Sequence, residues 1–186
     1  MRSRLTVRPQ SRRTLEERLA IRVPRAATLL SRLVWLLPPH SRLRRAALSR
    51  GIQRGIEAYN RGDYEAVLAG YDPDVEVVSE PELVELGFDA TYRGHDGWRR
   101  YAERWNAEWG AYEAAPDELW DLGDGRLLAI GAQRGRGSGS GAEITKDFAG
   151  LWTFSRGLVT REQYFFDRAE ALRAVGLDQP HDESQK

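Results

Sequence analysis

Cysteine is absent from the 186-residue chain, which excludes disulfide bonds, thiolate nucleophiles and cysteine-based metal sites. Histidine is scarce, and His40, His95 and His181 lie too far apart to show a metal-ligand spacing. The sequence therefore predicts no metal site. Long hydrophobic runs are also missing, because the most apolar stretch, residues 26–37, is shorter than a membrane-spanning helix and contains Arg32. What remains is a folded globular chain with 41% hydrophobic and 10% aromatic residues.

Charge is distributed unevenly, although the formal net charge is zero. Residues 1–50 carry 13 arginines and two acids, Glu16 and Glu17, which gives +11, and residues 51–186 carry the compensating −11. A basic arm of this kind docks on its own acidic body or on a partner copy, or binds an external anion. We expect docking. Nucleic acid is not the expected partner, because Trp35 is the arm's only aromatic residue and cannot provide a stacking surface.

Two segments of the arm resemble targeting or membrane signals. Residues 11–16, SRRTLE, look like part of a twin-arginine export signal, but a charged segment follows where a hydrophobic region is required. We therefore expect a cytoplasmic protein. The apolar segment 26–37 could lie on a membrane surface with its arginines facing anionic lipid, but packing against the domain or across a dimer is the interpretation we favour.

Hydrophobic periodicity predicts helices and strands along the whole chain. The expected helices cover residues 13–22, 24–37, 42–60, 64–71, 94–110 and 168–175. The expected strands cover residues 75–79, 126–136, 142–154 and 158–166. N-caps are expected at Ser41, Asp63 and Asp167, and hairpin turns at residues 124–125, 137–141 and 155–157. The long acidic connection at residues 81–92 is expected to cover a pocket mouth.

The order of these segments resembles the SnoaL-like branch of the nuclear-transport-factor-like superfamily. The segments that carry the resemblance are IQRGIEAYNRGD, GHDGWRRYAERWNAEWG and REQYFFDRAEALRAVGL. It implies an α+β fold in which a curved, mainly antiparallel sheet forms a cone with helices packed on it. The expected division is a basic helical N-terminal extension at residues 1–40, the cone domain at 41–177 and a disordered tail at 178–186. The resemblance also implies a homodimer, and we expect no cofactor.

Two enzyme branches of this superfamily provide a test of the reaction. In the ketosteroid isomerase branch, the oxyanion-binding tyrosine corresponds to Gly55, the catalytic base to Ser79 and the neutral aspartic acid to Gly150. All three groups are absent here, which disfavours that mechanism. The epoxide hydrolase branch uses an arginine and an aspartate two residues further on, where this chain has Arg134 and Arg136. Epoxide hydrolysis is therefore disfavoured as well.

The resemblance also implies which side chains point into the cone. From the three long strands these are Ile130, Ala132, Arg134, Arg136, Lys146, Phe148, Gly150, Trp152, Phe154, Glu162, Tyr164 and Phe166. Trp98, Tyr101 and Trp105 from the aromatic helix either fill the core or form a pocket wall, and packing is the favoured role of Tyr59. An apolar pocket with a few convergent polar groups is typical of a small-ligand site.

Glu162 is the candidate general base or acid, and Tyr164 is the candidate hydrogen-bond donor to an oxyanion. A carboxylate among aromatic rings has a raised pKa, which favours proton transfer near neutral pH. The interpretation we favour over catalysis is an Arg134–Glu162 ion pair, which would lower the pKa of Glu162 and leave it a poor base. Asp147 is a weaker candidate, because alternation with Phe148 points it outward.

Three functions remain open on these grounds. The first is a cofactor-independent isomerase or cyclase acting on a hydrophobic small molecule with a carbonyl group, in which Glu162 is the base and Tyr164 or Arg134 stabilises the enolate. The second is a non-catalytic ligand-binding module, in which Arg134 binds an anionic group and aromatic rings hold the rest of the ligand. The third is an interaction protein whose residues 1–40 dock on an acidic partner or make a peripheral membrane contact.

Overall fold

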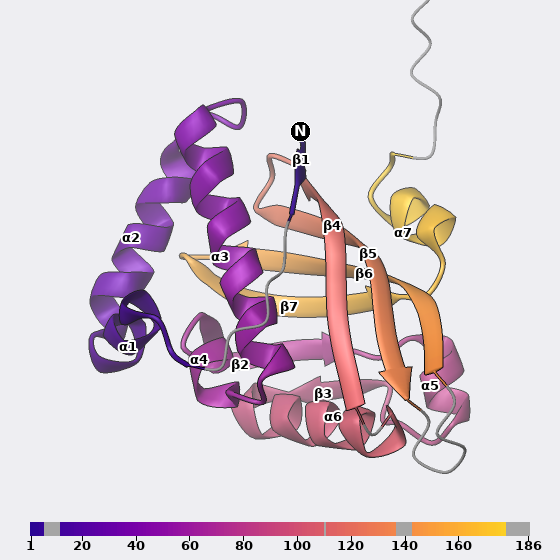
Figure 1. Ribbon diagram of the computed structural model, residues 1–186. Coiled ribbons are helices and arrows are strands. Elements are labelled where there is room, and N and C mark those ends of the chain that lie inside the picture. Colours follow the sequence, from indigo (N-terminus) through magenta and orange to yellow (C-terminus); the bar gives the residue numbers. More distant parts are fainter. Residues whose placement is uncertain (6–11, 110, 137–142, 178–186) are drawn as a thin grey trace, which may run out of the picture.

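The computed structural model describes residues 1–5, 12–109, 111–136 and 143–177, which form an α+β fold (Figure 1). Within these ranges the helices are α1 (Leu15–Arg22), α2 (Pro24–Leu36), α3 (Arg42–Asn60), α4 (Tyr64–Leu68), α5 (Pro81–Glu85), α6 (Gly94–Trp109) and α7 (Arg168–Ala174). The strands are β1 (Arg2–Arg4), β2 (Tyr71–Val78), β3 (Thr91–Arg93), β4 (Ala111–Asp121), β5 (Arg126–Arg136), β6 (Glu143–Ser155) and β7 (Leu158–Phe165).

The described strands form one curved, open sheet in the order β1-β4-β5-β6-β7-β2-β3. All neighbours pair antiparallel except β2 and β7, which run parallel. Helices α3, α4 and α6 cover the concave face, and α7 covers part of the other face (Figure 1). This arrangement confirms the predicted fold class, a curved and mainly antiparallel sheet with helices packed on it.

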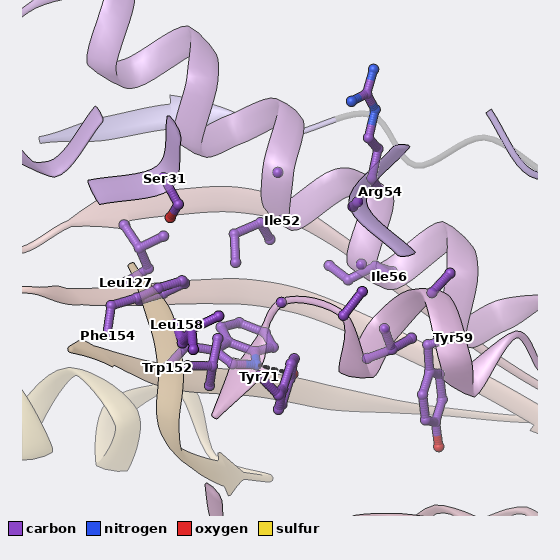
Figure 2. A pocket seen from close by; sticks show the side chains of 18 of the residues that line it. Ser31, Ile52, Arg54, Ile56, Tyr59, Tyr71, Leu127, Trp152, Phe154 and Leu158 are labelled. Atoms are coloured by element: carbon purple, nitrogen blue, oxygen red, sulfur yellow. Dashed lines mark hydrogen bonds between the residues drawn. The ribbon is translucent and has the colours of Figure 1, made fainter. Parts of the chain in front are cut away.

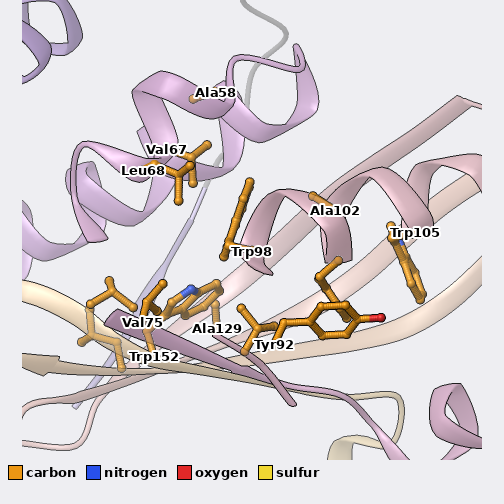
Figure 3. Close-up of a cluster of buried hydrophobic side chains, with 14 of the residues drawn as sticks. Ala58, Val67, Leu68, Val75, Tyr92, Trp98, Ala102, Trp105, Ala129 and Trp152 are labelled. Carbon is orange, nitrogen blue, oxygen red and sulfur yellow. The ribbon is translucent and has the colours of Figure 1, made fainter. Parts of the chain in front are cut away.

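Two separate apolar cores result from the alternation of side chains along the strands. The larger core lies on the concave face, where Trp98 of α6 and Trp152 of β6 pack beneath α3 and α4 (Figure 3). The smaller core lies on the opposite face, where Ile130 and Phe165 pack against Ala171 of α7. The concave face therefore carries the larger part of the apolar core.

Capping side chains begin three helices at the positions that the sequence predicts. Ser41 accepts a hydrogen bond from the backbone of Arg44, Asp63 from Ala66 and Asp167 from Glu170. The predicted turn at residues 155–157 is also confirmed, because Arg156 and Gly157 both adopt positive φ angles, as a tight hairpin between twisted strands requires. The turn expected at 137–141 and the tail expected at 178–186 lie outside the described residues.

The prediction of inward side chains on β5 is wrong by one residue. Trp152 on β6 pairs directly with Leu127, and Phe148 pairs with Gly131, so the odd-numbered residues of β5 share the concave face with them. Ile130, Ala132 and Arg134 therefore lie on the opposite face, and Arg134 is exposed. A shift of one residue exchanges the two faces of a strand, and the pairing with β6 determines the phase here. The side chain of Arg136 is outside the described part.

The N-terminal arm, residues 1–40, contacts its own domain through strand pairing and ion pairs. β1 pairs antiparallel with β4, although only helices were expected in the arm. Glu17 of α1 accepts a hydrogen bond at 2.8 Å from Arg61, and Arg13 binds Asp63 at 2.7 Å. These contacts support the predicted docking of the basic arm on the acidic body. Among the described residues, no helix combines the length and the apolar character needed to cross a membrane.

Candidate functional site

A cavity of about 740 Å³ lies between the concave face of the sheet and the helices (Figure 2). It brings together the following predicted site residues: Tyr59, Trp98, Tyr101, Trp105, Phe148, Trp152, Glu162, Tyr164 and Phe166. Arg134, the remaining predicted site residue, does not reach the cavity because it lies on the other face of β5. The polar side chain that β5 contributes instead is Gln133, which is buried.

Glu162 is the buried acid of this cavity, with 2% of its surface exposed. Strand β7 places it directly opposite Trp152 of β6, and the indole of Trp152 donates to Glu162 Oε1 at 2.7 Å. Trp98 of α6 donates to Glu162 Oε2 at 2.8 Å, and Tyr71 of β2 donates to Oε1 at 3.2 Å. The hydroxyl of Tyr164 also donates to Oε1. Four uncharged donors from four different elements therefore hold one carboxylate.

No cation pairs with Glu162 among the described residues, so the expected Arg134–Glu162 ion pair does not form. Burial raises the pKa of Glu162 above its ordinary value, and the hydrogen bonds from Tyr164, Trp98, Trp152 and Tyr71 oppose this shift without cancelling it. Burial, together with the nearby Glu162 charge, raises the pKa values of Tyr71 and Tyr164 well above their usual range. Both hydroxyls consequently stay protonated and remain donors at neutral pH.

Trp152 can reach Glu162 only because residue 150 is a glycine. A Cβ atom at Gly150 would lie 2.5 Å from the Trp152 ring, which is far inside van der Waals contact. The indole therefore fills the space above Gly150, the position that corresponds to the neutral aspartic acid of the ketosteroid isomerase branch. Ser79, at the position of that branch's base, is buried and donates to the backbone oxygen of Asp89 at 2.7 Å.

Tyr71 is the site residue that sequence reasoning missed. The predicted strand began at Val75, whereas β2 begins at Tyr71 and pairs with Val159 of β7 across a β-bulge. The bulge lies between Tyr71 and Glu76, and it separates the tyrosine from the regular alternation of the strand. The available signal was the aromatic residue directly before Asp72-Pro73, which ends the preceding helical segment. A strand prediction extended back to it would have included the tyrosine.

These features define a class of protein: an α+β cone that encloses an apolar cavity with a buried acid, suited to binding a small molecule. The model of the SnoaL-like domain family matches residues 52–162, and the chain belongs to this family. The family supports a small-molecule-binding domain of the isomerase or cyclase type. Among proteins with curated functions, none matches the sequence.

Several solved structures resemble most of this chain. TerC co-crystallized with polyporic acid is 28% identical, with a TM-score of 0.58, over 68% of this chain and 96% of TerC. An NTF2-like protein of unknown function from Burkholderia pseudomallei K96243 is 27% identical, with a TM-score of 0.58, over 68% of this chain and 95% of that one. A Catenulispora acidiphila DSM 44928 protein with a ketosteroid isomerase-like fold, in complex with trimethylamine, shares the fold at 16% identity and a TM-score of 0.54, over 73% of this chain and 97% of that one.

Proposed function

We propose that the protein binds a hydrophobic small molecule with a carbonyl group in the cone, and that Glu162 transfers a proton on the bound ligand without a cofactor. The observation that carries this proposal is a buried carboxylate in an apolar cavity that contacts only uncharged donors. Such a group has a raised pKa, which makes it a stronger base than an exposed carboxylate and lets it accept and return a proton. The co-crystallization of the 28% identical TerC with polyporic acid supports a small-molecule ligand.

The chemistry assigned to each residue follows from its position. Glu162 would take the proton from a carbon next to the ligand carbonyl, which leaves an enolate. Tyr71 and Tyr164 keep their protons, so either hydroxyl can turn from Glu162 to donate to the enolate oxygen. Trp98 and Trp152 keep the carboxylate in place while this happens. The proton returns from Glu162 to the ligand, either at the same carbon or at a conjugated one, which gives exchange or isomerisation.

Deuterium exchange tests the proton-transfer step directly. β-Tetralone, a compact aromatic ketone, should incorporate deuterium from heavy water faster with the protein than with buffer, as measured by mass spectrometry. Glu162→Gln should lower the catalysed exchange rate by at least about 100-fold, because the general base is lost. Tyr164→Phe keeps the base and the ring, and we expect it to lower the rate by about tenfold or more through weaker oxyanion stabilisation. Equal exchange rates in the wild type and the Glu162→Gln variant would contradict the proposed role.

A non-catalytic binding module is the alternative within the same cavity. The four hydrogen bonds to Glu162 favour it, because a carboxylate that already accepts from four donors is a weaker base than a free one. Under this alternative, polyporic acid or β-tetralone binds with a measurable dissociation constant, and the protein never accelerates exchange. Titration calorimetry beside the exchange assay separates the two functions.

A second candidate function, peripheral membrane contact, is favoured by the outer face of α2. Leu29, Leu33 and Leu36 are 52–80% exposed, while Thr28, Ser31 and Trp35 on the opposite face turn toward the domain. Five exposed arginines nearby form no ion pair within the described residues: Arg18, Arg22, Arg25, Arg32 and Arg42. An apolar stripe flanked by arginines fits an anionic membrane surface, which in cells is the cytoplasmic leaflet.

Vesicle flotation tests this second candidate. The protein should float with vesicles that contain phosphatidylserine, should bind less as salt rises, and should not bind pure phosphatidylcholine. Replacing Leu29 and Leu33 with glutamine should abolish flotation, whereas the control Leu86→Gln, at a still more exposed leucine after α5, should leave it unchanged. If the protein never floats, and the leucine variant instead changes the native mass from dimer to monomer, the stripe is the interface of the expected homodimer.

A further inference from the structure

The cavity extends well beyond the cone, into the space between α3 and the N-terminal helices. Its outer wall consists of small and aliphatic side chains of α1 and α2: Leu19, Ala20, Val23, Ala27, Leu30 and Val34. Most of this outer part precedes residue 52, where the match to the family model begins. The arm therefore adds a second chamber to the ligand cavity, made of residues that the SnoaL-like domain does not include.

The floor of this second chamber is a face of α3 that includes a row of very small residues. Ala47, Gly51, Gly55 and Tyr59 follow one another at four-residue spacing and all line the cavity. A Cβ atom at Gly51 or Gly55 would meet no atom within 4 Å, so neither glycine is required by close packing. Glycine inside a helix lowers stability relative to alanine. The chain nevertheless has glycine at both positions, and the space that a side chain would fill remains part of the cavity.

The charged side chains that line the cavity form two separate sets, Glu162 in the cone and the charges of α1 and α3 at the arm. Glu162, Tyr71 and Tyr164 form the inner end, and at the arm end the lining charges of Glu16 and Arg54 pair with each other. Between them most of the lining is apolar, with Ile52, Ile56, Leu127 and Leu158 projecting inward, and Ser31 adds one hydroxyl (Figure 2). An extended ligand would therefore place its polar group at Glu162 and an apolar chain toward the arm.

From this we infer that the ligand is an amphiphile with a neutral carbonyl head and an unbranched aliphatic chain. The carbonyl head binds beside Glu162, and the chain lies between α3 and α1–α2. This inference rests on the proposed binding function of the cone. A carboxylate head is disfavoured, because no cation pairs with Glu162 among the described residues and an ionised Glu162 repels a second anion.

Homologous methyl ketones test the assignment of the chain. Binding of methyl butyl, methyl hexyl, methyl octyl and methyl decyl ketone is measured by titration calorimetry on the full-length protein. Each methylene that enters an apolar chamber should tighten binding about fourfold until the chamber is full. A dissociation constant that does not fall with chain length in the wild-type protein would overturn the inference.

A blocking variant locates the chain. Gly51→Leu fills the second chamber from α3, so methyl butyl ketone should bind as before while the gain per methylene disappears. Gly51→Ala adds only one methyl group and should keep most of the gain. The matched control is Ala46→Leu, which adds the same side chain to the exposed face of the same helix and should change nothing. An unchanged chain-length series in Gly51→Leu, with an unchanged melting temperature, would show that the chain lies elsewhere and would refute the inference.

Failure of this inference and failure of the proposed function give different results. If β-tetralone or polyporic acid binds but longer ketones gain nothing, the cone function stands and the second chamber is not a chain site. If none of these compounds binds, both the proposed binding function and the inference are overturned. The exchange assay on Glu162→Gln tests proton transfer separately from the chain site, since this substitution leaves the second chamber intact.

Discussion

Glu162 is held in the interior by uncharged donors, and this arrangement determines its acid–base behaviour. Each hydrogen bond to a charged group stabilises it by about 1.5–3 kcal/mol, which favours the ionised form. Removal of the carboxylate from water opposes this effect, and the balance leaves the pKa of Glu162 raised. A cation in place of Tyr71 or Tyr164 would have lowered it. The residue therefore destabilises the folded state when it is ionised, as expected for a functional group rather than a structural one.

The pH dependence of stability follows from the raised pKa of Glu162. Because the folded state holds this proton more tightly than the unfolded chain, the stabilising contribution is complete below the ordinary pKa of 4.5 and is lost as pH rises through the folded-state value. Glutamine at position 162 cannot titrate. The wild type should therefore lose unfolding free energy relative to Glu162→Gln as pH rises from about 4 toward 8. Urea denaturation at several pH values measures this difference, and a slope of the opposite sign would mean that the folded pKa is depressed.

Sequence reasoning located Glu162 and Tyr164 but misplaced Arg134, and the physical reason is specific. Alternation along β5 gives two equivalent faces, and both Gln133 and Arg134 are polar, so the pattern itself cannot choose between them. The choice depends on pairing with β6, in which Trp152 lies opposite Leu127. Tyr71 was missed because a β-bulge separates it from the rest of β2. Both errors concern tertiary register, which local sequence does not encode.

At the scale of elements, most helices and strands were predictable because each carries its own local signal. The strand expected at 126–136 is β5, and the one expected at 158–166 ends one residue earlier as β7. Caps and tight turns determine these ends through hydrogen bonds within a few residues. β1 was not predicted, because its three residues become a strand only by pairing with β4, more than a hundred residues away. The short helix α5 was likewise hidden in a segment expected to be a loop.

The junction between α2, α3 and β4 depends on one buried ion pair. Arg44 of α3 binds both carboxylate oxygens of Asp121, at 2.8 and 3.0 Å, and donates to the backbone oxygens of Trp35 and Leu37 at the end of α2. The side chains of Arg44 and Asp121 are 3% and 5% exposed. The Arg44 guanidinium therefore connects the end of α2 to β4 of the sheet.

We expect Asp121→Asn to lower the unfolding free energy by about 3–5 kcal/mol, because it leaves the Arg44 charge buried without a counter-ion. The double variant Arg44→Met with Asp121→Leu removes both charges, and it should lose less than the single variant. Chemical denaturation of the three proteins measures the difference.

As a control, Asp124→Asn removes an ion pair with Arg126 in an exposed turn and should change stability by less than about 1 kcal/mol. A single variant as stable as the wild type would show that the junction does not depend on this pair.

Over the whole molecule, the charge asymmetry has a structural explanation. The arm's arginines fall into two groups, one of which faces the body and pairs with acids, as Arg13 does with Asp63 and Glu65. The second group, which includes Arg25 and Arg32, is exposed without an acidic partner in the described part of the chain. The first group attaches the arm, and the second is available for an external anionic surface. The net charge of zero is thus the sum of a positive N-terminal arm and a negative body.

Deletion of residues 1–40 tests whether the arm is an integral part of the domain. It removes the Trp35 and Leu37 carbonyls that Arg44 binds, and it opens one wall of the cavity above Ile52 and Ile56. The truncated chain should therefore melt at a lower temperature and self-associate. It would carry a net charge of −7, because nine arginines and two acids are removed, so a lack of charge cannot explain any loss of solubility. Thermal melts with light scattering measure both effects, and a peptide of residues 1–40 supplied in trans should restore part of the lost stability. A truncated protein with the wild-type melting temperature that stays monodisperse would show instead that the arm is an appendage to a self-sufficient cone.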